Sequence, residues 1–157
     1  MKGIDVVIDK QTTIFKARLW TTKKANYYGR CHRNYRDDQM IPEVIQDGNE
    51  YTTLLLNDRL DVISFFDVLP DRTHNEATVD IYFAVNIPNL YTTEDRDTEA
   101  ALSDVAYWLR AGGIFTIESI SEGYESWKQW GMVKKEDNMN PFFLFKFRTK
   151  VSYNLNC

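Results

Sequence analysis

The segment from Ala77 to Ile87 alternates apolar and polar residues, and no other feature of the chain limits its fold as strongly. Successive side chains of a strand point to opposite faces of a sheet, so the alternation predicts a strand with one buried and one more polar face. The residues expected on the buried face are Val79, Ile81, Phe83, Val85 and Ile87. The residues expected on the polar face are Thr78, Asp80, Tyr82 and Asn86. Such a strand is typical of an antiparallel sheet with its core on one side.

Further strand patterns lie on both sides of this segment. Two precede it, at Glu50–Leu56 and Asp61–Leu69, and two follow it, at Ile114–Ile120 and from Pro141 to Leu155. The apolar stretch Met40–Ile45 is too brief to predict an element of its own. Since the first three strands are consecutive and their connections are short, the sequence predicts an antiparallel meander.

Two segments have helical features. In residues 4 to 20 the apolar side chains recur at i, i+3 and i+4, which favours a helix over the strand that β-forming residues suggest at Thr12–Thr22. A second helix is expected to begin at Thr92-Thr93-Glu94-Asp95 and to end at Gly112-Gly113. Gly123–Gly131 predicts a short helix or turn. The sum is a single α+β domain over residues 1–157, with a mostly antiparallel sheet and two main helices packed on one face.

The composition excludes several classes of protein. With 43% hydrophobic residues, seven Gly and four Pro, the chain is neither disordered nor collagen-like. Its formal net charge of −4 disfavours non-specific binding to nucleic acid, which depends on a basic surface. No segment approaches the roughly 20 apolar residues that span a bilayer, and no signal-peptide pattern opens the chain. Cys31 and Cys157 are therefore expected to be reduced thiols in the cytoplasm.

No motif in the sequence identifies a catalytic centre, a cofactor site or a metal site. Cys31 and His32 are neighbours and His74 is remote, which falls short of a recognisable set of metal ligands. Acidic residues such as Asp67 and Asp80 are numerous on the expected strands. No pair of them has a spacing that indicates the two carboxylates of a glycosidase or a magnesium site. A metal-dependent hydrolase or nuclease that uses Asp67, Asp80 or His32 is therefore the weakest of the functional hypotheses.

Two aromatic segments lack an evident position in the predicted core. Tyr27–Arg36 interleaves tyrosines with basic residues, a combination that is favoured at protein interfaces and can also stack on nucleic-acid bases. The same pattern is compatible with a solvent-exposed strand that binds nothing. Trp127 and Trp130 could line a ligand groove, cover the edge of the core or contact another protein. The aromatic content of 14% therefore suggests that neighbouring molecules complete this domain.

The order of these elements resembles that of tailed-bacteriophage neck and tail-completion proteins, in particular ring proteins of the tail-terminator type from phages of Bacteroidetes hosts, such as crAss-like phages. The resemblance covers residues 4 to 155 and is carried by three segments: Asp61–Asp67, Ala77–Asn86, and Leu90-Tyr91 followed by the helix with an acidic start. Its motifs are soft patterns without invariant chemistry.

The resemblance implies a structural protein without catalytic residues or cofactor. Copies of the chain would form a closed hexameric or dodecameric ring in the virion. The ring would be assembled in the host cytoplasm and would not associate with a membrane. The ring would join the portal or its adaptor to the tail and surround the channel through which DNA is ejected. The protein would not bind this DNA in a sequence-specific way.

A ring contact joins two different surfaces of neighbouring copies, so two complementary surfaces are needed. The basic segment is expected to supply one of these surfaces and the acidic helix start, which also includes Glu99, the other. The interface residues predicted in this way are Arg30, Arg33, Tyr35, Arg36, Glu94, Asp95, Asp97, Trp127 and Trp130. The alternative function is a small cytoplasmic domain that binds a ligand or a protein on its sheet face, with Trp127 and Trp130 in the groove.

Overall fold

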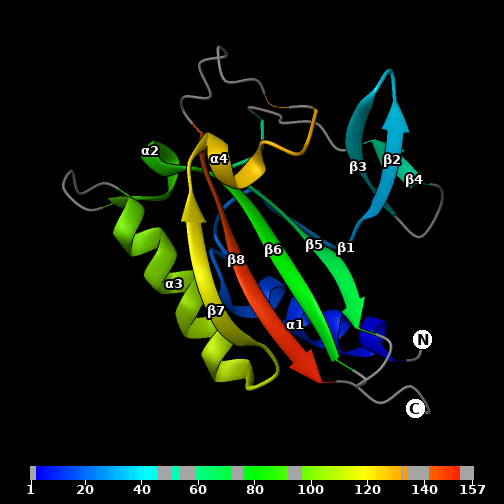
Figure 1. The fold of residues 1–157 in the computed structure, drawn as a ribbon. Coiled ribbons are helices and arrows are strands. Elements are labelled where there is room, and N and C mark those ends of the chain that lie inside the picture. Colours follow the sequence, from blue (N-terminus) through cyan, green and yellow to red (C-terminus); the bar gives the residue numbers. More distant parts are fainter. Residues whose placement is uncertain are drawn as a thin grey trace.

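The computed structural model describes residues 3–45, 51–53, 59–71, 76–91, 97–131, 133 and 142–152. The described residues form four helices and eight strands, arranged as one large sheet, one small sheet and the helices around them (Figure 1). In chain order the elements are α1 (Ile4–Arg18), β1 (Ala25–Arg30), β2 (His32–Arg36), β3 (Gln39–Ile45), β4 (Tyr51–Thr53), β5 (Val62–Asp71), β6 (Glu76–Asn86), α2 (Ile87–Leu90), α3 (Asp97–Gly112), β7 (Thr116–Glu122), α4 (Tyr124–Trp127) and β8 (Phe142–Ser152).

The large sheet has the strand order β1-β5-β6-β8-β7 and is antiparallel except for the parallel pair β1–β5. This confirms the predicted α+β class with a mostly antiparallel sheet. The predicted order of the meander is wrong, because β4 does not precede β5 in this sheet. The first strand of the chain occupies that place, since β1 lies beside β5 with Ala25 opposite Val62.

The small sheet, which we call the ribbon, has the strand order β2-β3-β4. The interpretation of Met40–Ile45 as too short for an element is wrong, because Gln39–Ile45 is the central strand β3 of the ribbon. It is stabilised from both sides, by β2 along Gln39–Glu43 and by β4 along Glu43–Ile45. A local pattern of apolar residues could not show this pairing.

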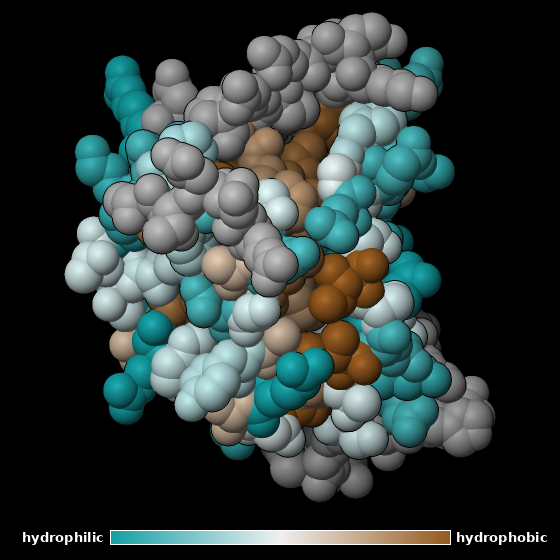
Figure 2. Space-filling view, turned by 90° about the vertical axis from the view of Figure 1, so that its left-hand side faces the viewer, coloured by the Kyte–Doolittle hydropathy of each residue, from teal (hydrophilic) through white to brown (hydrophobic). Residues whose placement is uncertain are grey.

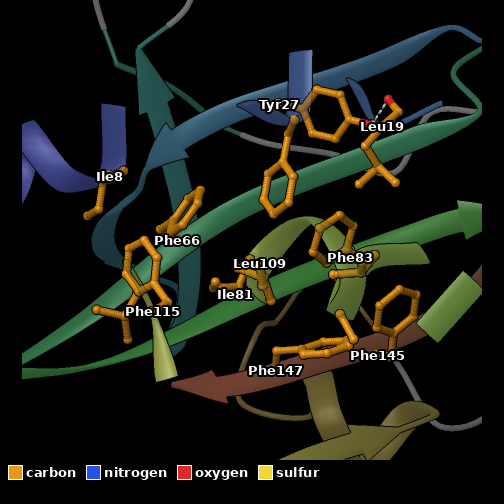
Figure 3. Close-up of a cluster of buried hydrophobic side chains, with 14 of the residues drawn as sticks. Ile8, Leu19, Tyr27, Phe66, Ile81, Phe83, Leu109, Phe115, Phe145 and Phe147 are labelled. Carbon is orange, nitrogen blue, oxygen red and sulfur yellow. Dashed lines mark hydrogen bonds between the residues drawn. The ribbon is translucent and has the colours of Figure 1, made fainter. Parts of the chain in front are cut away.

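The two long helices, α1 and α3, pack on one face of the large sheet, which we call the helix face (Figure 1). The core between them and the sheet combines aliphatic side chains with several stacked aromatic rings, some of which Figure 3 shows. Phe83 stacks on Phe145 with 5.2 Å between ring centroids, and Phe15 of α1 meets Phe83 edge-on at 5.6 Å. The Tyr27 hydroxyl donates to the Leu19 carbonyl at 2.6 Å, so this ring is part of the core and the expectation that it lacks an internal position is wrong.

The opposite face of the large sheet, which we call the ribbon face, is also buried over much of its area. Trp127 and Trp130 are both fully buried there and each meets Phe65 edge-on at 5.5 Å. The expectation that the two tryptophans lie at a subunit interface or in an open ligand groove is therefore wrong, because they fill a second core. Tyr82 and Asp80 are buried as well, which corrects the prediction of a polar outer face for β6.

The helix predictions are confirmed within the described residues. The helix expected at residues 4 to 20 is α1, with Asp5 in its first turn and Arg18 in its last, and the competing strand is absent. The second helix, α3, ends at Gly112, and Gly113 follows with φ of +66°, a conformation that favours glycine. Its expected start at Thr92–Asp95 lies outside the described residues.

Gly131 fixes how the chain after α4 lies against the ribbon. Its N–H donates to the Met40 carbonyl at 2.7 Å, and an added Cβ would lie only 2.5 Å from Cβ of Gln39. We expect Gly131→Ala to lower the free energy of unfolding by about 1–3 kcal/mol, because a Cβ atom so close to the root of another side chain forces the backbone to move. Urea unfolding measures this loss. An unchanged midpoint in Gly131→Ala would contradict the close contact.

Candidate functional site

A groove of about 940 Å³ runs between α1 and the consecutive strands β1 and β2. Helix α1 contributes one side of its surface to the groove, and its lining residues recur at three- and four-residue spacing: Asp5, Ile8, Asp9, Thr12 and Lys16. The strands contribute every residue from Tyr27 to Arg33, and β5 contributes Asp67 and Val68. The groove therefore lies along the β1 edge of the large sheet.

Gly29 keeps the groove open in its middle. Its φ is +80°, and the nearest atom to an added Cβ would be Oγ1 of Thr12 at 3.8 Å. A side chain at this position would project into the space between strand and helix. Sequence reasoning did not single out Gly29, because a lone glycine in a strand does not indicate a groove.

Charged groups line the groove unevenly. Arg30 crosses it to bind Asp5, with 3.1 Å between Nη1 and Oδ1, and both side chains are substantially exposed. Asp9 and Lys16 form no ion pair with the residues that the structure describes. The groove thus contains one carboxylate, of Asp9, and one ammonium group, of Lys16, that are not paired with each other or with another described residue, and both are on α1.

Arg33 connects the ribbon to the large sheet. Its Nε and Nη2 each donate to a carboxylate oxygen of Asp67 at 2.8 Å. The Asp67 side chain is only 4% exposed, so burial raises the pKa of this carboxyl although the guanidinium opposes that shift. Burial also raises the pKa of the Cys31 thiol, with a smaller contribution from Asp67, which keeps this cysteine protonated and unreactive.

A second buried carboxylate, Asp80, lies directly opposite Asp67 in the β5–β6 pairing. It accepts two hydrogen bonds from Arg148, at 2.9 and 3.0 Å, and Nζ of Lys146 lies 3.6 Å away. A row of four charged side chains thus crosses the sheet, in which the two adjacent carboxylates lie between Arg33 and Arg148. Carboxylates held by guanidinium groups hold strands together and are poorly suited to activate water, so this geometry gives the hydrolase hypothesis no support.

The predicted interface residues that the structure describes lie in several different elements. Arg30 and Arg33 line the groove but bind acidic groups of their own chain, while Tyr35 is 69% exposed on β2. Asp97 lies in the first turn of α3. Glu94, Asp95, His74, Cys157 and the side chain of Arg36 lie outside the described part of the chain. Arg33 is already paired with Asp67 of its own chain, so it is not available for the expected contact between the basic segment and the acidic helix start of a neighbouring copy.

The other edge of the large sheet, β7, is the second exposed feature. No strand pairs with its outer side among the described residues, and Ile120 is 42% exposed there. Ile120 lies opposite Phe147, so its side chain is on the helix face. Figure 2 views the molecule from the side that carries α3 and β7, and hydrophobic side chains reach the surface on this side.

The described residues contain no group of three or more His, Cys, Asp or Glu side chains suited to hold a metal ion. None of their helices has both the length and the apolar composition needed to cross a membrane. The chain matches no protein-family model, no curated protein and no solved structure.

Proposed function

We propose that this chain is a structural virion protein whose copies form a closed ring in the neck or tail of a tailed phage, joining the portal or its adaptor to the tail around the DNA channel. The role in the virion depends on the resemblance described above. Self-assembly is supported by one observation on the molecule: both edges of the large sheet are open among the described residues, at opposite ends of the sheet.

Open edges favour assembly because their backbone N–H and C=O groups are free to pair with another strand. Two different edges on one molecule permit a head-to-tail contact, and repeated rotation by the same contact closes a ring. In a closed ring every β1 edge and every β7 edge has a neighbour.

The test is the mass of the full chain in solution. Light scattering at high concentration should give a multiple of 18.5 kDa, and negative-stain images should show rings. Because a ring can require its neighbours to assemble, the measurement is repeated with the products of adjacent portal and tail genes. A monomer under both conditions would overturn the proposal.

The groove favours a second candidate function, a small domain that binds an extended peptide beside β1. Strand addition in a groove between a helix and an edge strand is a common mode of peptide recognition. A chain that remains monomeric but captures extended peptides from a random library, and loses them when Gly29 is replaced by a bulky residue, would favour this candidate over the ring.

A further inference from the structure

We propose that β7 of one copy adds to the open edge of β1 in the next copy, antiparallel to it, with Ile120 seated in the groove under α1. The inference depends on the proposed self-assembly and names the contact that would produce it. The large sheet would then continue from one subunit into the next.

The β1 edge has backbone groups available for such a strand. In a parallel ladder, alternate residues direct their backbone groups to the same neighbour. The Lys24 carbonyl accepts from the Val62 N–H at 3.2 Å, so Lys24 and the alternate residues Asn26 and Tyr28 face β5. The backbone groups of Tyr27 therefore point to the open side, into the groove.

Ile120 is the side chain that fits this groove. It is on the helix face of its sheet, and α1 bounds the groove on the helix face of β1. When β7 lies beside β1 in a continuous sheet, Ile120 is on the same side as Ile8 and Thr12. Gly29 leaves room for it, because it has no side chain of its own.

The direction of β7 follows from the large sheet and agrees with the charges. β1 is parallel to β5 and β8, while β7 is antiparallel to β8, so a sheet that continues without reversal brings β7 and β1 together antiparallel. The end of β7, at Glu122, then meets the beginning of β1. That region carries four exposed basic side chains: Lys16, Arg18, Lys23 and Lys24.

The opposite ends are complementary as well. Arg110, in the last turn of α3 just before β7, would lie near Asp5 and Asp9, which are at the Arg30 end of β1. A parallel contact would instead bring Glu122 to these two acids, where like charges repel.

Two-fold contacts satisfy fewer of these features. A β1–β1 dimer would join two grooves and leave Ile120 exposed, whereas a β7–β7 dimer would leave both grooves empty. The β7–β1 contact covers both edges with one kind of interface, which is the requirement for a closed ring.

Disulfide cross-linking between two differently tagged full-length chains tests the contact. In a Cys31→Ala, Cys157→Ser background, one chain carries Ile120→Cys and the other carries Lys16→Cys or Asp9→Cys, two positions on the groove wall. Mild oxidation should link the two tags in the mixture, while each variant alone should stay unlinked.

Each other outcome overturns the inference in a recognisable way. Self-linking of Ile120→Cys indicates a β7–β7 dimer, and self-linking of a groove variant indicates a β1–β1 dimer. Assembly without any link indicates a different interface and leaves the proposed ring intact. Absence of assembly in the unmodified chain, both alone and with its neighbouring proteins, contradicts the proposed function itself.

A matched pair of substitutions gives a second measurement. Ile120→Lys should raise the dissociation constant for assembly by about tenfold or more, because it would bury a charged side chain beside Ile8 and Thr12. Leu69→Lys is the control, since Leu69 is a similarly exposed apolar residue (39% against 42%) on the opposite face of the sheet. Equal effects of the two substitutions would contradict the inference.

Discussion

Replacing Trp127 with alanine should lower the free energy of unfolding by about 3–5 kcal/mol, the range for removing a fully buried large aromatic side chain. Trp127 is 0% exposed and lies edge-on to Phe65 and Tyr82 at 5.5 and 5.6 Å. Its Nε1–H donates to the Phe145 carbonyl at 3.2 Å. Alanine would leave a cavity between α4 and the ribbon face and remove that hydrogen bond.

Urea unfolding in dilute solution, where copies of the chain are separate, measures this loss. Trp127→Phe is the control, because it retains most of the ring contacts and loses the hydrogen bond, so a smaller loss is expected. If Trp127→Ala instead left unfolding unchanged and weakened only assembly, the tryptophan would be an interface residue and the second core would be wrong.

Arg33→Met should lower the free energy of unfolding by about 3 kcal/mol at neutral pH. The substitution keeps the aliphatic stem but leaves the Asp67 carboxylate buried without its guanidinium. Breaking a buried ion pair by removing one partner is costly, although water at the partly exposed Arg33 keeps the effect at the lower end of that range. The matched control is Arg30→Met, because the Arg30–Asp5 pair is exposed on both sides and should contribute about 0–1 kcal/mol.

The loss in Arg33→Met should become smaller as the pH is lowered. Burial already raises the pKa of Asp67 in the folded chain, and removal of Arg33 raises it further. A carboxyl whose folded pKa lies above its unfolded pKa is most favourable to folding when protonated, below the unfolded value. Its contribution is lost as the pH rises through the folded value. The difference between Arg33→Met and the parent chain should therefore be larger at pH 8 than at pH 5, and the opposite trend would contradict this assignment.

The sequence predicts elements that depend on local periodicity and misses those that depend on partners distant in the chain. The alternation in β6 and the helical spacing in α1 are local signals, and both elements were predicted. The ribbon was not, because β3 is stabilised by its pairing with β2 and β4 rather than by its own residues. The parallel pairing of β1 with β5 likewise could not be predicted, because neither segment contains a pattern that indicates its partner.

The same distinction applies to the candidate site. Arg30 and Arg33 were identified as charged residues among aromatic ones, but their partners Asp5 and Asp67 are 25 and 34 residues away. The groove arises from the approach of α1 to β1, which no pattern in either segment indicates. Trp127 and Trp130 had no evident position in the predicted core, because β3, whose Met40 pairs with Trp130, was not predicted.

The covalent path between the two sheets has a mechanical consequence. β1 and β2 are consecutive, with only Cys31 between them, so one stretch of chain is an edge strand in both the large sheet and the ribbon. A pulling force on the ribbon would pass directly into β1 and load its parallel hydrogen bonds with β5 in shear. The Arg33–Asp67 ion pair lies just beyond that junction and would carry part of this load, because it links β2 directly to β5. In the proposed ring, the strength of this junction would limit how far the ribbon can be displaced before the β1 edge separates from β5.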